Sequence, residues 1–149
     1  MSDTADSDQE REPGRVLRVL VVEDDPDVRL LLHTYLNLDD RLQVCGEAAD
    51  GQQALDLMGA GRFDVVVLDL NLPVVDGLTI LPKLRSRHPR MAIVVYSAHV
   101  ASVLTERTVL RLGADAVAAK WMPLDRLVTT ICEAAASRSL AEGGLRHQT

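Results

Sequence analysis

Short apolar runs alternate along the chain with segments whose apolar residues recur every three or four positions. In the first such segment, Val28, Leu31 and Tyr35 have the spacing of one face of a helix. The apolar runs predict strands over residues 16–22, 42–48, 63–68, 91–96 and 116–119. The periodic segments predict helices over residues 26–35, 52–58, 78–87, 102–112 and 123–139. Because strands and helices alternate, the sequence predicts an α/β fold with a parallel sheet covered by helices on both faces.

The two ends of the chain lack this pattern. Residues 1–15 are rich in acidic side chains and have no large hydrophobic residue after Met1, so we predict a disordered acidic tail. Residues 141–149 contain a pair of glycines and no apolar face, which predicts a flexible C-terminal tail. One folded domain is therefore expected over residues 16–140.

Composition and charge narrow the classes of function. The 149 residues carry a formal net charge of −6, and non-specific nucleic-acid binding needs a basic surface instead. No apolar stretch reaches the roughly 18 residues of a membrane helix, and the acidic start is unlike a signal peptide. Cys45 and Cys132 lack metal-ligand spacing and are expected to be buried structural residues. We expect a cytoplasmic protein with no membrane and no direct nucleic-acid partner.

Polar residues able to do chemistry follow four of the five predicted strands. They are Glu23 with Asp24, then Asp69, Ser97 and Lys120. In a parallel α/β sheet the functional crevice lies beyond the carboxyl ends of the strands, so these side chains are expected to meet there. Singly, each has a structural explanation as a helix cap, a turn residue or a surface lysine. Asp25 is best explained in that way, as the cap of the helix that begins at Pro26.

The three carboxylates at these strand ends predict a cation. At about 4 Å and an effective dielectric of about 20, each pair of carboxylates repels by about 4 kcal/mol. Hard oxygen ligands and open water positions favour Mg²⁺ over Ca²⁺. The ammonium of Lys120 and the hydroxyl of Ser97 add groups that attract an anion. The set predicts a phosphoryl site in which Asp69 is the nucleophile and forms an aspartyl phosphate.

The same blocks resemble a known family. They are VLVVEDDP at residues 19–26, DVVVLDLNLPVVDG at 64–77, VVYSA at 94–98, and GAD at 113–115 followed by Lys120. In this order they resemble the receiver domain of two-component response regulators over residues 16–140. The resemblance implies a flavodoxin-like fold, a doubly wound five-stranded parallel sheet in the order 2-1-3-4-5 with five helices.

The resemblance also implies roles for individual residues. Asp69 would accept phosphate from a histidine kinase or a histidine phosphotransfer protein. Mg²⁺ would be held by the carboxylates Glu23, Asp24 and Asp69 and by the backbone carbonyl of Asn71. Ser97, the backbone of Ala98 and Lys120 would bind the phosphoryl group. Phosphorylation would then change the affinity for a downstream protein, and a homodimer could form through residues 100–112, 117 and 123–137.

Three features depart from the family pattern. Lys120 is followed by Trp121-Met122-Pro123, where the family usually has proline next, often after a cis peptide bond. Val117 stands where the family usually has Tyr or Phe, a ring that moves inward on phosphorylation. These two departures predict a modified switch. The chain also ends where many relatives continue into an output domain, which predicts a stand-alone receiver. In addition, Asn71 and His99 match positions that flank the path of hydrolytic water, so we hypothesise that they tune the phosphate lifetime. A solvated loop histidine is the alternative for His99.

Two other functions compete with the switch. A degenerate receiver would bind partners without phosphorylation, and Val117 and Trp121 leave this open. A phosphohydrolase of the haloacid-dehalogenase type would also use Asp69 and Mg²⁺. That family needs a second aspartate two positions later as general acid, and this chain has Asn71 there. A dinucleotide-binding fold is excluded because no GxGxxG follows the first strand.

Overall fold

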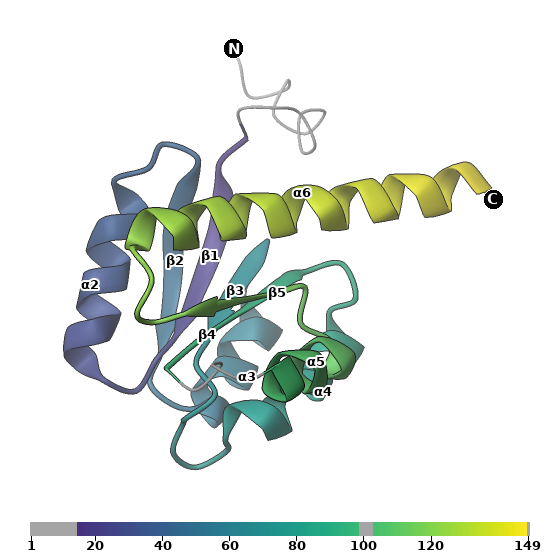
Figure 1. The fold of residues 1–149 in the computed structure, drawn as a ribbon. Helices are drawn as coiled ribbons and strands as arrows, with labels where there is room; N and C mark the ends of the chain where they lie inside the picture. The colour runs from purple at the N-terminus through teal and green to yellow at the C-terminus, as the bar shows by residue number, and fades with distance from the viewer. Residues whose placement is uncertain (1–14, 99–102, 149) are drawn as a thin grey trace.

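Five strands alternate with five helices in the computed structural model, which describes residues 15–98 and 103–148 (Figure 1). In chain order the elements are β1 (Leu17–Val22), α2 (Pro26–Asn37), β2 (Leu42–Ala48), α3 (Gly51–Ala60), β3 (Val65–Leu68), α4 (Gly77–Arg87), β4 (Ala92–Ser97), α5 (Val103–Leu112), β5 (Ala116–Ala119) and α6 (Leu124–Gln148). Every predicted strand and helix is present, with most bounds shifted by a few residues.

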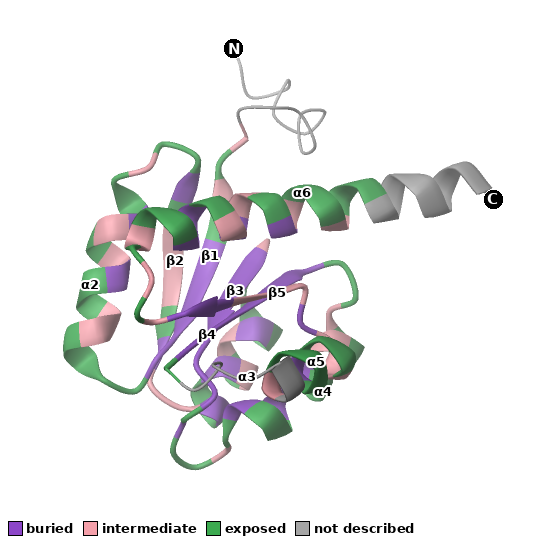
Figure 2. Cartoon of the chain, viewed as in Figure 1, coloured by how far each residue is buried: buried purple, intermediate pink, exposed green. Residues whose placement is uncertain are grey.

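The strands form one parallel sheet in the order β2-β1-β3-β4-β5, which confirms the predicted flavodoxin-like fold. Helices α2 and α6 cover one face, and α3, α4 and α5 cover the other (Figure 1). Side chains of β1, β3 and β4 are buried almost throughout (Figure 2), since both faces of these strands are covered. The outer strand β2 carries a bulge: Val44 pairs with Val19 and Gly46 with Leu20, which leaves Cys45 unpaired.

Aspartate side chains begin three of the helices. Asp25 accepts a hydrogen bond from the Asp27 N–H at the start of α2, as predicted. Asp50 and Asp76 do the same for α3 and α4 by accepting from the N–H groups three residues further on. Each of these caps follows a strand or its loop, so the helices begin at the carboxyl edge of the sheet. That edge is where the predicted chemistry lies.

The structure differs from the sequence predictions in two places. Helix α6 continues to Gln148 instead of ending near Ser139, and it projects past the sheet (Figure 1). Arg138 holds the helix to the body here, because its guanidinium donates to Asp115 and to the Pro89 carbonyl. We expected Cys45 and Cys132 to be buried, but both are free thiols that are only half-buried. The predicted N-terminal tail up to residue 14, and His99, lie outside the described residues.

None of the helices in residues 15–98 and 103–148 is both long and apolar enough to cross a membrane.

The loop between β3 and α4 contains a strained residue. Val74 has a φ of 69°, a left-handed conformation that is an outlier for a β-branched side chain. The N–H of Val75 donates to the carbonyl of Pro73 at 2.8 Å and closes a tight turn around Val74. The Val74 side chain is 79% exposed, so burial does not offset this strain.

Replacing Val74 by glycine is expected to raise the free energy of unfolding by about 0.5–1.5 kcal/mol. Relief of about 1–3 kcal/mol of strain exceeds the entropy lost by ordering a glycine, about 0.5–1 kcal/mol. Urea unfolding of Val74→Gly and Val74→Asn measures the gain. Val74→Ala is the control, because it keeps a Cβ and should recover less. A glycine variant no more stable than the alanine variant contradicts the prediction.

Candidate functional site

The end of β1 brings two carboxylates to the carboxyl edge of the sheet. Glu23 is only 2% exposed, and its backbone N–H donates to the Ala48 carbonyl at 3.0 Å, which continues the pairing with β2. Its Oε2 accepts from the Asp25 N–H at 3.1 Å. Asp24, the next residue, is exposed. One carboxylate is therefore fixed inside the protein and the other faces the solvent.

Asp69 follows β3 and lies beside them. It is buried, and its N–H donates to the Val22 carbonyl at 3.0 Å, so β1 and β3 end at the same level. Its Oδ1 accepts from the Asn71 N–H at 3.2 Å. The chain after Asp69 turns back closely, because the Gly77 N–H donates to the Leu70 carbonyl at 2.9 Å. A Cβ at Gly77 would lie 2.6 Å from the Asp69 carbonyl oxygen, so only glycine fits there.

Lys120, after β5, reaches across to both buried carboxylates. Its Nζ lies 2.7 Å from Glu23 Oε1 and 3.1 Å from Asp69 Oδ2. Its backbone N–H donates to the Ser97 carbonyl at 3.1 Å, which ties the ends of β4 and β5 together. The ammonium also lies 5.9 Å from the centre of the Tyr96 ring. Lys120 thus brings one ammonium into contact with both Glu23 and Asp69.

The charges of this site perturb one another. Burial raises the pKa of Glu23 above its ordinary value, although the hydrogen bond from Lys120 opposes the rise. Burial alone would lower the pKa of Lys120, but its hydrogen bonds to Glu23 and Asp69 raise that pKa overall. Lys120 therefore stays an ammonium at neutral pH, and burial makes the charged form of Glu23 costly.

The donor set fits a magnesium ion. Glu23, Asp24 and Asp69 each offer a carboxylate oxygen, and these three atoms lie within 4.8 Å of one another. All are hard oxygen ligands, two are fixed by burial, and the third is open to solvent. A bound Mg²⁺ would neutralise charge on the carboxylates and on an incoming phosphoryl group.

The remaining predicted site residues lie after β3, at the end of β4 and within β5. Ser97 is buried at the end of β4, Ala98 is exposed next to it, and Asn71 is exposed after β3. Val117 is half-buried, opposite Val95, and packs against the core under α3, α4 and α5. The structure therefore brings Glu23, Asp24, Asp69, Ser97 and Lys120 to one edge.

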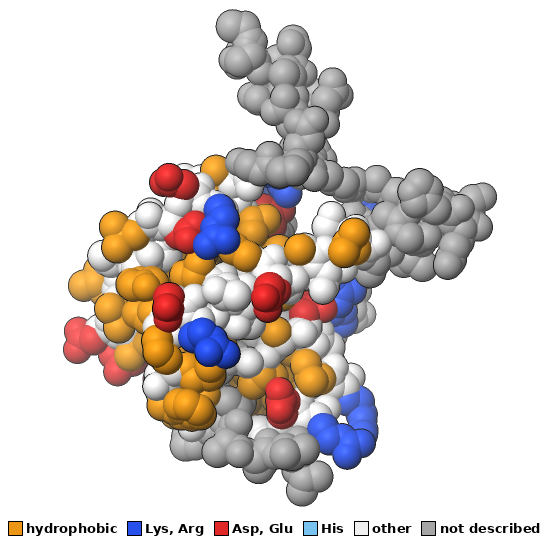
Figure 3. All heavy atoms as spheres, turned by 45° about the horizontal axis from the view of Figure 1, so that its top comes forward, with side chains coloured by type: hydrophobic (Ala, Val, Ile, Leu, Met, Phe, Trp, Pro, Cys, Tyr) orange, Lys and Arg blue, Asp and Glu red, His pale blue; other side chains and the backbone are white. Residues whose placement is uncertain are grey.

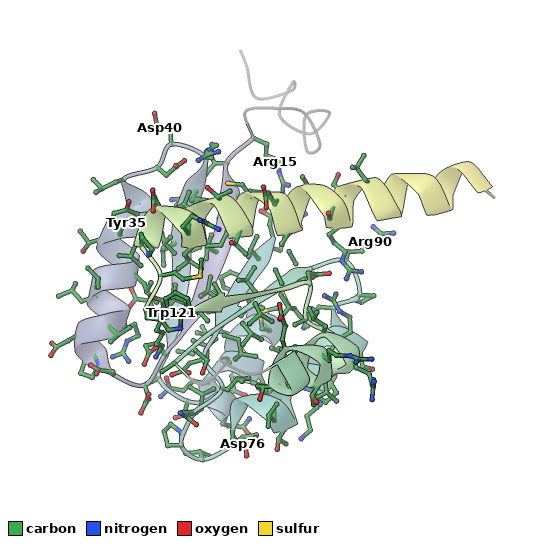
Figure 4. All side chains as sticks on the ribbon, in the orientation of Figure 1. Arg15, Tyr35, Asp40, Asp76, Arg90 and Trp121 are labelled. Atoms are coloured by element: carbon green, nitrogen blue, oxygen red, sulfur yellow. The ribbon has the colours of Figure 1, made fainter. Side chains whose placement is uncertain are left out.

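Trp121 follows Lys120 on the surface. Its side chain is 75% exposed (Figure 4). All peptide bonds in the described part of the chain are trans, including the one between Lys120 and Trp121.

Sequence reasoning missed one positioning residue, Arg29 of α2. Its Nη1 donates to the carbonyl of Glu23 at 2.7 Å and to that of Asp24 at 3.4 Å. Its Nε lies 3.6 Å from Glu47 of β2, and Glu47 also contacts His33 at 2.6 Å. Arg29 thus holds the backbone of the two carboxylates at the end of β1. The only sequence signal is its place one helical turn after the cap Asp25, which does not show where the guanidinium points.

Comparison with known proteins defines the class. The family model of the response regulator receiver domain matches residues 19–132. The chain belongs to this family.

Particular relatives agree with the assignment. The chain is similar to the protein-glutamate methylesterase/protein-glutamine glutaminase of Pyrococcus horikoshii, with 39% identity over 103 residues, or 69% of this chain and 25% of that protein. The protein of the same description from Azospirillum brasilense is 39% identical over 102 residues, or 68% of this chain and 23% of that protein. The chain therefore spans about a quarter of the length of these relatives.

Solved structures share the fold. The receiver domain of the putative response regulator NarL from Mycobacterium tuberculosis superposes with a TM-score of 0.76 at 30% identity, covering 82% of this chain and 98% of that one. A CheY-like receiver domain protein from Methanospirillum hungatei has a TM-score of 0.76 at 23% identity, covering 85% and 98%. The second likeness bears on the fold alone.

Proposed function

We propose that this chain is a phosphorylation-dependent signalling switch whose phosphoacceptor is Asp69. A carboxylate oxygen of Asp69 forms a bond to phosphorus while the bond from phosphorus to the donor's imidazole nitrogen breaks, and the imidazole leaves with a proton. The donor is a histidine kinase or a histidine phosphotransfer protein. The observation that carries the proposal is the contact of Lys120 with both Glu23 and Asp69, beside three carboxylate oxygens within 4.8 Å.

The other site residues have matching roles. Glu23, Asp24, Asp69 and the backbone carbonyl of Asn71 hold Mg²⁺, which supplies charge neutralisation at the phosphoryl oxygens. Lys120 leaves its present partners to pair with the phosphoryl group, and Ser97 and the backbone of Ala98 bind its oxygens. Because the Lys120 N–H is tied to the Ser97 carbonyl, a change at one strand end is transmitted to the other.

The output of the switch is a change in affinity for a protein partner. Such a change requires that the partner distinguish the two states. Helix α5, β5 and α6 adjoin Lys120 and Ser97, so they form the surface that responds, either to another protein or to a second copy of this chain. Val117 on β5 fills the position of the usual ring with a smaller side chain, so the inward movement at this position is smaller.

A second candidate is a receiver that binds partners without phosphorylation. Val117 and the exposed Trp121 favour it, since both depart from the family's switch. The complete set of carboxylates and Lys120 favours the phosphorylated switch instead. A phosphohydrolase is disfavoured because Asn71 cannot supply the general acid.

The test is incubation with Mg²⁺ and acetyl phosphate, followed by intact mass measurement. Wild-type protein is expected to gain the mass of one phosphoryl group, and Asp69→Asn none, because an amide is not nucleophilic enough to accept it. Asp50→Asn is a matched control, since asparagine still caps α3, and it should be labelled like wild type. No labelling of wild type would favour the phosphorylation-independent receiver. Steady hydrolysis of many phosphate esters would favour the hydrolase.

A further inference from the structure

The end of β1 is held by a series of contacts that begins on the outer strand β2. Glu47 of β2 contacts two residues of α2, since its Oε2 lies 2.6 Å from His33 Nδ1 and its Oε1 lies 3.6 Å from Arg29 Nε. Arg29 in turn donates from Nη1 to the backbone carbonyls of Glu23 and Asp24, at 2.7 and 3.4 Å. Two of the three carboxylates that fit a magnesium ion are therefore attached to backbone that one guanidinium holds.

The bulge in β2 sets the direction of Glu47. Beyond the unpaired Cys45, Glu47 lies opposite Val21, whose side chain packs in the core under α2 and α6. Paired residues of neighbouring strands point to the same face of a sheet, so Glu47 faces α2. If the pairing continued without the extra residue, Glu47 would lie opposite Val22, on the face covered by α3, α4 and α5. The bulge therefore turns Glu47 toward Arg29.

Asp24 depends on the contact with Arg29 more than Glu23 does. Glu23 is buried, and its carboxylate accepts hydrogen bonds from Lys120 and from the Asp25 N–H. Asp24 is exposed, so packing does not fix its side chain, and the contact of Arg29 with its carbonyl restrains its backbone. Loss of the guanidinium would therefore loosen the one carboxylate that burial does not hold in place.

We propose, on the basis of the magnesium site in the proposed function, that Arg29 held by Glu47 is a positioning residue that raises the affinity of the site for Mg²⁺. Removal of groups that orient metal ligands typically lowers metal affinity by tenfold to a hundredfold. Arg29 cannot itself be a ligand, because a guanidinium has no acceptor atom, and its positive charge repels a nearby cation. Any gain in affinity from Arg29 must therefore come from the position that it gives the backbone, and not from its charge.

Binding of Mn²⁺, which takes the same oxygen ligands, tests the proposal without any phosphoryl transfer. The electron paramagnetic resonance signal of the free ion measures binding of Mn²⁺, and competition measures binding of Mg²⁺. Arg29→Gln is expected to weaken binding of both ions about tenfold, whereas the loss of its charge alone would tighten binding. Arg29→Lys keeps the charge and can still donate to the Glu23 carbonyl, so it should weaken binding by no more than about threefold.

A double variant tests whether Glu47 acts through Arg29. Glu47→Ala frees the guanidinium and is expected to weaken metal binding about threefold to tenfold. Glu47→Ala combined with Arg29→Gln should bind no more weakly than Arg29→Gln alone, because the two residues form one series of contacts. A loss from Glu47→Ala that persists in full without Arg29 would contradict the proposal, since Glu47 would then act by its own charge.

The matched control is Arg62→Gln, which removes an exposed arginine before the start of β3, at the edge of the sheet opposite the site. Lys and Arg side chains lie at several separate places on the surface (Figure 3), so this variant measures the effect of net charge alone. It should bind both ions within about twofold of wild type. Urea unfolding in the presence of a chelator shows that each variant is folded before metal is added.

Unchanged or tighter metal binding by Arg29→Gln would overturn the proposal, as would a wild type that binds neither ion. Labelling by acetyl phosphate separates this outcome from a failure of the proposed function. Wild type that binds Mg²⁺ but is not labelled at Asp69 would contradict the signalling switch and leave the role of Arg29 intact. Wild type that is labelled as expected, while Arg29→Gln binds metal normally, would do the reverse.

Discussion

Replacing Lys120 by alanine is expected to destabilise the metal-free protein by about 2–4 kcal/mol at neutral pH. The variant leaves Glu23 and Asp69 buried side by side without the ammonium that now contacts both. The expected loss is below that of breaking a fully buried pair, because Lys120 itself is partly exposed. Urea unfolding in the presence of a chelator measures it.

The loss should depend on both pH and Mg²⁺. The pKa of Lys120 is raised on folding, so its contribution is complete below its ordinary pKa of 10.5 and is lost only as the pH rises through the folded value. The pKa of Glu23 is also raised, so the buried carboxylate becomes neutral as the pH falls toward its ordinary value of 4.5, and the effect of the substitution shrinks there. Mg²⁺ should restore part of the stability at neutral pH, since it binds only the folded protein.

Lys83→Ala is the control, because it removes the chain's other lysine at an exposed position. Its free energy of unfolding should change by less than about 0.5 kcal/mol. If Lys120→Ala were as stable as this control without metal, the ammonium would not be needed to neutralise Glu23 and Asp69.

Replacing Asp115 by alanine is expected to destabilise the protein by about 3–5 kcal/mol, whether or not metal is present. Its carboxylate accepts from Arg85 at 2.7 Å, from the Ile93 N–H at 2.8 Å, and from Arg138 of α6. The substitution removes an acceptor from the partly buried guanidiniums of Arg85 and Arg138 and from the N–H of Ile93 in β4. Asp115→Asn keeps an acceptor but loses the charge, so its loss should be smaller.

Thermal and urea unfolding of the two variants check this order. Asp40→Ala is the control, since Asp40 is exposed in the loop between α2 and β2 (Figure 4) and should change the stability by less than about 0.5 kcal/mol. A loss at Asp115 no larger than at Asp40 would show that Arg85 and Arg138 find other partners. Arg85 also donates to the carbonyls of Gly113, Met91 and Pro89. Because these bonds remain when Asp115 is replaced, they reduce the loss of stability that the substitution causes.

The sequence predicts what depends on short-range pattern. Apolar runs and helical periodicity predict the strands and helices. The polar residues after the strands predict the candidate site, because parallel strands end at one edge of a sheet. The contact of Lys120 with Glu23 follows from topology, since these residues are 97 positions apart. The ionic contacts of Asp115 could not be predicted, because nothing in a sequence shows which distant arginine turns inward.

Two other features depend on local balances that pattern does not resolve. Helix α6 continues past the expected end near Ser139, and Arg138 fixes it to the body close to that point through Asp115 and the Pro89 carbonyl. Val74 adopts a positive φ because the chain must turn back sharply between Asp69 and the close approach at Gly77. Residue propensities alone would predict neither the end of α6 nor the positive φ of Val74.

The exposed indole at position 121 also has a spectroscopic consequence. Trp121 is the chain's single tryptophan, and it is joined by one peptide bond to the lysine that contacts both buried carboxylates. The tryptophan emission of the unlabelled protein therefore comes from one known place beside the phosphoryl site. The family's usual proline at this position has no fluorescence, so here the molecule carries its own optical reporter of events at that site.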